Sequence, residues 1–230
     1  IIIGGGASGL LLADALGSDP FFKAKRIALF EKQPQKENDR TWCFWESGSG
    51  PFDALIHKKW SVIRFRGPEF ERTIPMAEYT YKMLRGIDFY EEYYRRLRGY
   101  PNIEIRYEAV ESLKESETAA IVSTALGSYR APRVLSSVMF QPPKSLMQPY
   151  PLLKQHFLGW FIRTEEAVFD PGAATFMDFS VPQQGNTRFM SILPFSPNEA
   201  LVEDTLFSDA LLEDMQYEDA LKSYITKALT

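Results

Sequence analysis

The hydrophobic pattern at the start of the chain changes within a few residues from a strand-like run to a helical one. Residues 1–3 are β-branched isoleucines, residues 4–9 read GGGASG, and apolar side chains then recur at helical spacing up to Leu16. This order predicts a strand, a tight glycine turn and a helix. In that context a G-x-G-x-x-G spacing is a candidate site for the pyrophosphate of a dinucleotide.

Each position of this motif has its own expected task. Gly4 permits the turn, Gly6 lets the backbone approach a pyrophosphate, and Gly9 lets helix and strand pack closely. Ala7 and Ser8 begin the helix, whose free N–H groups and positive dipole end favour phosphate. These five residues are therefore our candidate contacts for the phosphates of a cofactor.

A second strand is predicted by the run RIALF at residues 26–30, and Glu31 follows it directly. Glu31 lies 22 residues beyond Gly9, near the spacing of the acid that binds a ribose hydroxyl in dinucleotide-binding folds. An acid here favours a free 2′-hydroxyl, and so FAD or NAD over NADP. The alternative is a glycine turn in another kind of α/β protein, with Glu31 merely solvated.

The middle of the chain mixes short alternating runs with one helical stripe. Its expected elements are a strand pair at 60–67 and 70–76, a helix at 81–100, a strand at 102–110, a hairpin around Gly127-Ser128, and a strand at 134–140 that rejoins the first sheet.

Beyond residue 140 the pattern changes again. Four prolines within 141–151 indicate a linker, and strand-like runs between turn signals then predict an antiparallel sheet before a helix at 211–229. We expect an α/β fold with a FAD/NAD(P)-binding, Rossmann-like domain over 1–140, including inserted strands around 60–76. A β-rich substrate region is expected over 152–230.

Composition and charge exclude several classes of function. The 230 residues are 45% hydrophobic and 24% charged, as in ordinary soluble proteins. A net charge of −4, with no basic cluster among aromatics, argues against nucleic acid as a partner. Cys43 is the single cysteine and the two histidines are 99 residues apart, so we expect no metal site. No apolar run reaches ~18 residues, so no transmembrane helix is expected.

Residues 39–46 read DRTWCFWE, which we interpret as a functional loop. Arg40 is a candidate for binding the phosphates or ribose of the cofactor, and Trp42, Phe44 and Trp45 are candidates for lining an apolar cavity. The alternative is a loop whose aromatic side chains fill the core. Arg85, at the start of the predicted helix, is either a further phosphate contact or an exposed arginine.

Four stretches, NDRTWCFW, QHFLGW, FMDFSVPQ and LPFSPNEALVEDTLFS, in this order and spacing, resemble the bacterial lycopene cyclases of the β-cyclase type. The resemblance implies a flavoprotein with FAD as cofactor, active in its reduced form, and NAD(P)H as reductant. It implies an isomerase, or intramolecular lyase, that cyclises the linear ends of lycopene or a related acyclic carotene into the β-rings of γ- or β-carotene. It also implies a cytoplasmic enzyme bound peripherally to the membrane that holds this substrate.

The resemblance links catalysis to the acid of LVEDT, which is Glu203, with Asp204 beside it. Cyclisation begins with a proton added to an alkene, and a carboxylic acid donates it readily only if burial raises its pKa. In a regular strand, Glu203 and Asp204 point to opposite faces, so one of them is expected to face the cavity. The alternative is a strand carboxylate that faces solvent. Asp178, in FMDF, has similar neighbours and is a weaker candidate.

A carbocation must be held away from nucleophiles, and aromatic faces stabilise such charge. The candidates for this substrate pocket are Trp42, Phe44, Trp45, Trp160 and Phe161. Packing in the core is the alternative for the tryptophans.

Two other functions remain open on the sequence. One is a redox flavoenzyme, such as an aromatic hydroxylase or a prenyl reductase, and the other is a nucleotide-binding module without turnover. The chain starts inside an expected strand and ends inside an expected helix, so we interpret it as a fragment of a longer enzyme. The resemblance implies that the remainder carries a further flavin contact, which leaves open whether this chain alone binds FAD.

Overall fold

A parallel sheet forms at the start of the chain, as the hydrophobic pattern predicts. The computed structural model describes residues 1–140 and 152–228, which divide into two compact units. Within the described chain, the first unit comprises residues 1–42 and 84–140, and the second comprises 43–83 and 152–228. The expected linker at 141–151 lies outside the described residues.

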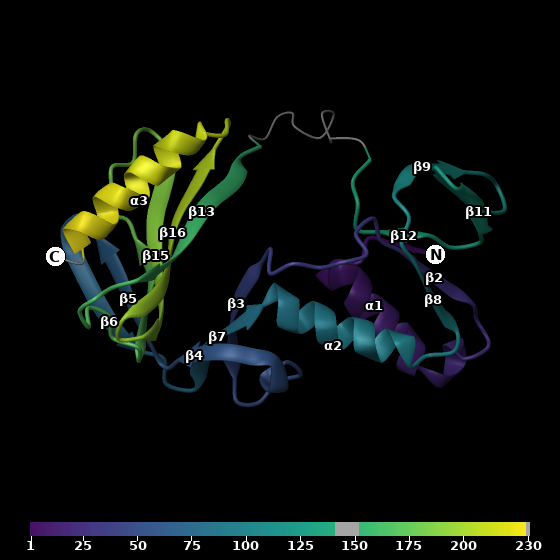
Figure 1. Ribbon diagram of the computed structural model, residues 1–230, viewed down its shortest axis with the longest axis horizontal. Helices are drawn as coiled ribbons and strands as arrows, with labels where there is room; N and C mark the ends of the chain where they lie inside the picture. Colours follow the sequence, from purple (N-terminus) through teal and green to yellow (C-terminus); the bar gives the residue numbers. More distant parts are fainter. Residues whose placement is uncertain (141–151, 229–230) are drawn as a thin grey trace. The chain divides into compact units, whose positions relative to one another are not determined.

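The first unit is built on a four-stranded parallel sheet in the order β12-β1-β2-β8. Figure 1 shows α1 and α2 on one side of this sheet and the antiparallel strands β9, β10 and β11 on the other. Its elements are β1 (Ile2–Ile3), α1 (Ala7–Ser18), a 3-10 turn (Pro20–Phe22), β2 (Ile27–Phe30), α2 (Gly86–Arg98), β8 (Ile103–Arg106), β9 (Val110–Glu115), β10 (Ala120–Thr124), β11 (Gly127–Ala131) and β12 (Leu135–Ser136).

The two central strands of this sheet, β1 and β2, carry almost fully buried side chains. Ile2 and Ile3 in β1 and Leu29 in β2 are almost fully buried, and so is Leu10 on the facing side of α1. Strand β12 pairs with β1, and β8 pairs with β2, both in parallel. The predicted strand, glycine turn and helix, the hairpin at Gly127 and the returning strand near 134–140 are therefore confirmed.

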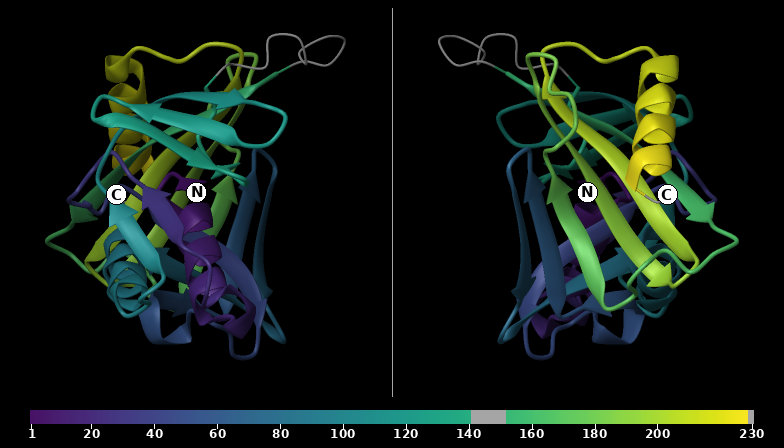
Figure 2. Two further views of the ribbon diagram at one scale, coloured as in Figure 1. Left: turned by 90° about the vertical axis from the view of Figure 1, so that its right-hand side faces the viewer. Right: turned by 90° about the vertical axis from the view of Figure 1, so that its left-hand side faces the viewer.

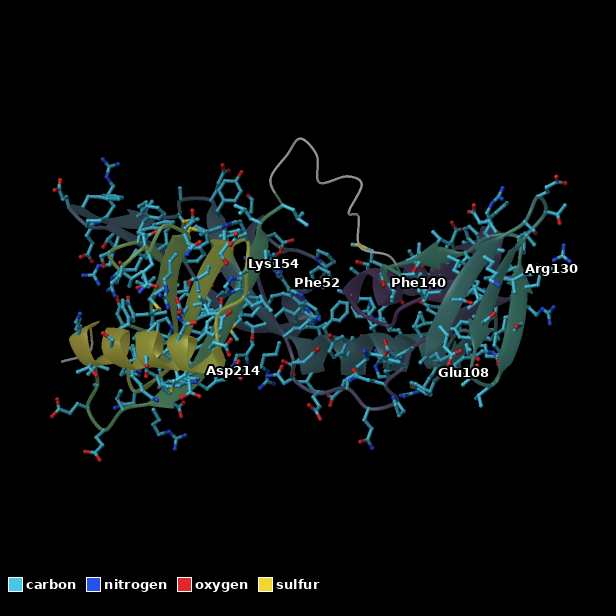
Figure 3. The ribbon with its side chains drawn as sticks, turned by 90° about the horizontal axis from the view of Figure 1, so that it is seen from above. Phe52, Glu108, Arg130, Phe140, Lys154 and Asp214 are labelled. Carbon is cyan, nitrogen blue, oxygen red and sulfur yellow. The ribbon has the colours of Figure 1, made fainter. Side chains whose placement is uncertain are left out.

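The second unit is built on a six-stranded mixed sheet in the order β13-β16-β15-β14-β5-β6. Helix α3 packs against β16 and β13 (Figure 2). Figure 3 labels Lys154 and Asp214, the first residues of β13 and α3. The elements of this sheet and its helix are β5 (Val62–Gly67), β6 (Phe70–Pro75), β13 (Lys154–Arg163), β14 (Ala173–Asp178), β15 (Thr187–Ser196), β16 (Glu199–Ser208) and α3 (Asp214–Ala228).

The inserted strand pair belongs to this second sheet rather than to the first domain, where we expected it. Strand β5 pairs antiparallel with β6, as predicted, but it also pairs in parallel with β14. The sheet is therefore mixed, whereas the turn signals beyond residue 152 predicted only antiparallel neighbours. Hairpin signals report pairing between consecutive strands, and they carry no information on a strand that joins from far along the chain.

Two local expectations are wrong, and both errors fall on a small three-stranded sheet in the order β3-β7-β4. The expected loop at 39–46 is largely strand β3, because aromatic residues and Thr41 favour a pleated surface. The first residues of the expected helix at 81–100 form strand β7, and the helix begins only at Gly86. The strands of this sheet are β3 (Thr41–Ser47), β4 (Ile56–Trp60), which follows a 3-10 turn (Asp53–Leu55), and β7 (Tyr79–Arg85).

Candidate active site

A groove lies at the carboxyl ends of the parallel strands in the first unit, where such folds bind ligands. Its volume is about 270 Å³, and Gly4, Gly6, Glu31 and Arg40 all line it. The sequence-predicted candidates at Ala7, Ser8 and Arg85 are not among its lining residues. Ala7 and Ser8 begin α1, and the Arg85 guanidinium is paired with Asp88 at 2.7 Å.

The glycines of the motif meet very different surroundings. A Cβ atom on Gly9 would lie 1.9 Å from the backbone oxygen of Gly4, so only glycine permits this approach of helix and strand. A Cβ on Gly6 would meet no atom within 4 Å, which leaves open space above the start of α1. Gly6 caps α1 without a side-chain hydrogen bond, and the first turn of the helix contains no acid. The groove therefore offers open space and uncapped N–H groups to an anion.

Glu31 points into the start of this groove and is 7% exposed. Its Oε2 accepts a hydrogen bond from the Gly5 N–H at 2.8 Å and pairs with the Lys36 ammonium at 2.9 Å, while Oε1 accepts from the Gln33 N–H. Burial opposes ionisation, but these partners together hold the pKa of Glu31 below its usual range. The carboxylate is thus charged at neutral pH, as the binding of a ribose hydroxyl requires.

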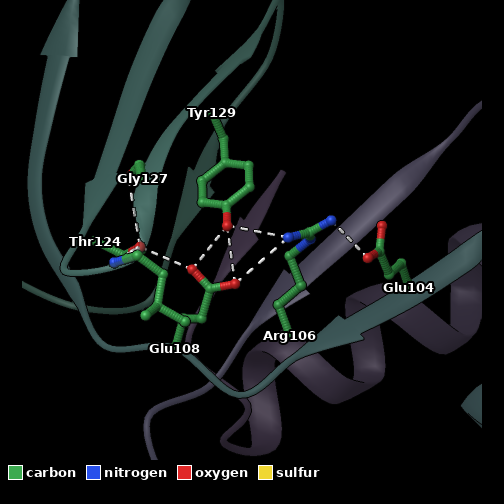
Figure 4. Close-up of polar contacts among 7 residues, drawn as sticks. Glu104, Arg106, Glu108, Thr124, Gly127 and Tyr129 are labelled. Atoms are coloured by element: carbon green, nitrogen blue, oxygen red, sulfur yellow. Dashed lines mark hydrogen bonds and ion pairs between the residues drawn. The ribbon is translucent and has the colours of Figure 1, made fainter.

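Glu108 also lines the groove, and the sequence reasoning missed it. Its carboxylate accepts hydrogen bonds from Thr124 Oγ1 at 2.7 Å and from the Tyr129 hydroxyl at 2.9 Å, and it pairs with Arg106 (Figure 4). The hydrogen bond from Thr124, followed by those from Tyr129 and Arg106, lowers the pKa of Glu108. Its position two residues after the end of β8 was a usable signal, because parallel strands end at one edge.

Two neighbouring acids on β16 point to opposite faces of the second sheet, as the strand period predicts. Asp204 is fully buried, and its two oxygens accept hydrogen bonds from Arg188 Nε and Nη2 at 2.9 and 2.5 Å. This bidentate pair lies on the face that α3 covers, next to the buried side chains of Met190 and Val202. Asp204 is therefore committed to an internal ion pair.

Asp178 lies on the same face as Asp204 and is likewise fully buried. It accepts hydrogen bonds from the Tyr224 hydroxyl at 2.8 Å, from Arg66 at 3.4 Å and from Ser180. A pocket of about 480 Å³ beside α3 is lined by Asp178, Arg188 and Tyr224 among others. The structure therefore separates Asp178 from Glu203 by the thickness of the sheet.

Glu203 occupies the other face, without a cation. Its register partners are Gly159 on β13 and Ser191 on β15, and the Ser191 hydroxyl donates to the Phe176 carbonyl oxygen instead. Thr205 Oγ1 donates to Glu203 Oε1 at 3.1 Å. Among the described residues, no hydrogen-bond donor contacts Oε2 and no cation pairs with this carboxyl. Burial, and then the charge of Asp204, raises the pKa of Glu203 against the opposing hydrogen bond from Thr205.

An aromatic and apolar cluster belongs to the same unit and includes Leu201, which lies two residues before Glu203 on the same face. Trp45 stacks on Tyr81 at 4.3 Å between ring centroids and meets the edge of Phe176 at 5.1 Å. Burial, then Cys43 and finally the charge of Glu203 raise the pKa of Tyr81. Burial and then the charge of Glu203, against a hydrogen bond from Tyr81, raise the pKa of Cys43 to about 12. The Cys43 thiol is thus protonated and a poor nucleophile. Tyr81 was missed because it was predicted in a helix.

The expected aromatic pocket does not form as one group. Trp42 packs on Phe89 and Tyr90 of α2 in the first unit, and Phe44 packs against Phe52. Trp160 lies on the α3 face, with the Lys222 ammonium 5.9 Å from its ring centroid. Trp160 is therefore on the opposite face of the sheet from Glu203.

Trp45 and Phe161 remain from the expected pocket. Phe161 lies opposite Leu201 in the sheet, on the face of Glu203, and its ring stacks on Phe195. The arrangement around Glu203 can deliver a proton to an apolar molecule and surround the resulting positive charge with aromatic rings.

Comparison with known proteins gives one family and one common fold. The sequence matches the family described as "Lycopene cyclase protein" over residues 1–229. A lycopene beta-cyclase from Paracoccus sp. (strain N81106 / MBIC 01143) is 34% identical over 190 residues, which cover 80% of this chain and 45% of that protein. The chain thus spans less than half the length of this relative.

Two solved structures share the fold at low sequence identity. A geranylgeranyl bacteriochlorophyll reductase-like protein from Thermoplasma acidophilum superposes with a TM-score of 0.68 at 13% identity, over 98% of this chain and 60% of that one. The protein CtdE in complex with FAD gives a TM-score of 0.56 at 11% identity, over 93% of this chain and 59% of its own.

The contrast between the two acids predicts opposite effects on stability. The pKa of Glu203 is raised in the folded state, so its ionisation costs stability as the pH rises above the ordinary carboxyl range of about 4.3. Glu203→Gln should therefore be as stable as the wild type or more stable at pH 7, and this advantage should vanish as the pH falls towards 4. Chemical denaturation at both pH values measures the difference.

Asp204→Asn is the matched control, because it leaves Arg188 buried without its charge partner. We expect it to lower the free energy of unfolding by about 3–5 kcal/mol at pH 7. If Glu203→Gln lost as much stability as Asp204→Asn at pH 7, then Glu203 would belong to a structural ion pair.

Proposed function

Because the chain belongs to the lycopene cyclase family, we propose that it forms the nucleotide-binding and acid-bearing parts of a lycopene β-cyclase. The enzyme would convert the linear ends of lycopene, or of a related acyclic carotene, into β-rings. The observation that carries this proposal is Glu203, a carboxyl with a raised pKa and a free oxygen, without a cation and close to an aromatic cluster.

We propose FAD as the cofactor, with its pyrophosphate over Gly4 and Gly6 and its adenosine ribose at Glu31. The open space at Gly6, the uncapped start of α1 and the ionised Glu31 support this placement. When bound and reduced by NAD(P)H, the flavin would supply an electron-rich ring system that stabilises positive charge, with no net transfer of electrons. The reaction is then an isomerisation.

Glu203 would act as the general acid. The protonated carboxyl adds its proton to a terminal alkene, and the neighbouring alkene captures the carbocation as a carbon–carbon bond forms. Loss of a proton from the ring to the Glu203 carboxylate, which the first step has left as a base, would then give the cyclic alkene, so the product has the same atoms as the substrate. Trp45, Tyr81 and Phe176 would stabilise the cation, and Asp204 would hold β16 in place through Arg188.

The cofactor proposal is tested by two glycine variants of the complete protein. Gly6→Val should fold normally, because its backbone is extended and its side chain enters open space, yet it should lose bound flavin through a clash with the pyrophosphate. Flavin absorbance per protein, together with thermal unfolding, measures both effects. Gly9→Val is the control for a packing defect, and it should fail to fold. Full flavin content in Gly6→Val would place the cofactor elsewhere.

The catalytic proposal is tested by Glu203→Gln, which keeps the shape of the side chain but cannot act as the acid. We expect cyclisation of lycopene to fall by ~10²–10⁴ with flavin content unchanged. Glu199→Gln is the matched control on the same strand, because Glu199 is partly exposed and paired with Arg163. Near-normal cyclisation by Glu203→Gln with full flavin would assign the acid elsewhere. Stoichiometric consumption of NAD(P)H and oxygen would instead identify a redox flavoenzyme.

We further propose that the enzyme is a peripheral protein on the cytoplasmic face of the membrane. Within residues 1–140 and 152–228, no helix is both long and apolar enough to span a bilayer. Leu152 and Leu153, directly before β13, are 52% and 54% exposed, and such side chains can enter the lipid interface. A water-insoluble substrate requires contact of this kind.

Flotation with lycopene-loaded liposomes measures this association. The wild type should float with the vesicles. Leu152→Ser/Leu153→Ser should bind at least about tenfold less, because burying the exposed half of both leucines contributes roughly half of the ~1.5–3 kcal/mol per fully buried side chain. Wild-type protein that remains in the dense fractions while it cyclises liposomal lycopene would contradict membrane docking.

A further inference from the structure

Lys36 is a largely buried lysine in the groove that we assign to the cofactor. Its side chain is 14% exposed, although lysine is rarely buried unless it is paired. The ammonium forms an ion pair with Glu31 Oε2 at 2.9 Å and lies 5.2 Å from the centroid of the Tyr90 ring. Glu31, Lys36 and Tyr90 all line the groove, and all three belong to the first unit.

Two different elements hold this ammonium in place. Glu31 directly follows β2, whereas Tyr90 lies on α2. The charge of the carboxylate and the face of the aromatic ring both attract a cation. The lysine therefore loses rotamer freedom before any ligand binds, and a contact from its ammonium to a ligand costs little further entropy.

The carboxylate of Glu31 has few acceptor positions left. An ionised carboxylate offers about four such positions, two on each oxygen. On Oε2, the Gly5 N–H at 2.8 Å and the Lys36 ammonium take both, and on Oε1 the Gln33 N–H takes one. Beside these described partners, one position on Oε1 remains for a ligand.

A ribose presents two adjacent hydroxyl groups, and each of them can donate and accept a hydrogen bond. With its internal contacts intact, Glu31 can accept from only one of the two. Lys36 carries three N–H donors, and Glu31 is its single ion-pair partner within residues 1–140 and 152–228. The ammonium thus has donors to spare at the place where the second hydroxyl needs a partner.

We propose that Glu31 and Lys36 together recognise the 2′- and 3′-hydroxyl groups of the cofactor's adenosine ribose. Glu31 Oε1 accepts a hydrogen bond from one hydroxyl, and the Lys36 ammonium donates one to the oxygen of the other. Lys36 is then a specificity-determining residue of the groove. The inference rests on the proposed FAD site and adds the second ribose contact, which Glu31 alone does not supply.

Competition among three mononucleotides tests this assignment in the apo form of the complete protein. Bound FAD is displaced by 5′-AMP, by 2′-deoxy-AMP or by 3′-deoxy-AMP, and FAD fluorescence gives the three dissociation constants. In the wild type, each deoxynucleotide should bind about tenfold more weakly than 5′-AMP, because it leaves a charged side chain without a hydrogen bond. In Lys36→Met, one of these two ratios should fall to about one, because the donor to that hydroxyl is gone, and the other ratio should stay.

The titrations are made at pH 8, where the charge of Glu31 is the same in every variant. Burial raises the pKa of Glu31, and hydrogen bonds from Gln33 and then Lys36 lower it, so the loss of Lys36 shifts this pKa upward. A pH of 8 lies far above the ordinary carboxyl value of about 4.3. A ratio that changes at this pH therefore reports a lost contact, and not protonation of Glu31.

Lys32→Met is the matched control, because it removes the same charge from the lining of the groove. The three nucleotides share one phosphate, so loss of charge alone should weaken them by the same factor and leave both ratios unchanged. Thermal unfolding checks that Lys36→Met is folded. If it is not, Lys36→Ala, which leaves room for water beside Glu31, is judged by the same ratios.

If the Lys36 variant keeps both ratios, then Lys36 serves only as the counter-ion of Glu31, and the proposal is overturned while the FAD site stands. Equal binding of the three nucleotides by the wild type overturns it as well. A wild-type apoprotein that binds no FAD overturns the cofactor proposal and this inference together.

Discussion

The second unit depends on how one strand places two neighbouring carboxyl groups in opposite environments. Asp204 is buried against Arg188, and the bidentate pair compensates the loss of water around both charges. Glu203, one residue earlier, faces apolar and aromatic groups without such a partner, so its neutral form is favoured. The period of the β-strand thus places one carboxyl of a single dipeptide in a buried ion pair and the other in surroundings that raise its pKa.

The first unit also contains neighbouring residues of which one is needed for packing and another faces open space. Gly9 is fixed by the backbone oxygen of Gly4, whereas Gly6 faces open space. Glu31 is kept ionised by Lys36 and backbone N–H groups, and Glu108 by Thr124, Tyr129 and Arg106. The groove therefore combines uncapped helix N–H groups with two anionic side chains, and these are the groups that phosphates and ribose hydroxyls require.

Local signals were enough to predict much of this arrangement. The different periods of helices and strands predict the order of strand, glycine turn and helix, with Glu31 at the end of the second strand. The two-residue period of a strand also predicts the opposite orientations of Glu203 and Asp204. The predictions failed for Thr41–Ser47 and Tyr79–Arg85, where aromatic residues suit a strand, a loop or a helix face equally well. What decided these segments was pairing between β3 and β7, which lie far apart in the sequence.

The site around Glu203 was only partly predictable for the same reason. Trp160 and Phe161 are adjacent in sequence, but alternation sends one to α3 and the other to the face of the acid. Gly159 lies against Glu203 because of a strand register that no local sequence signal reports. The fold itself is shared with a reductase-like protein and with CtdE at 13% and 11% identity, so the fold cannot specify the chemistry. The reaction must instead be set by a few side chains on one sheet face, where a carboxyl without a cation among the described residues lies near an aromatic and apolar cluster.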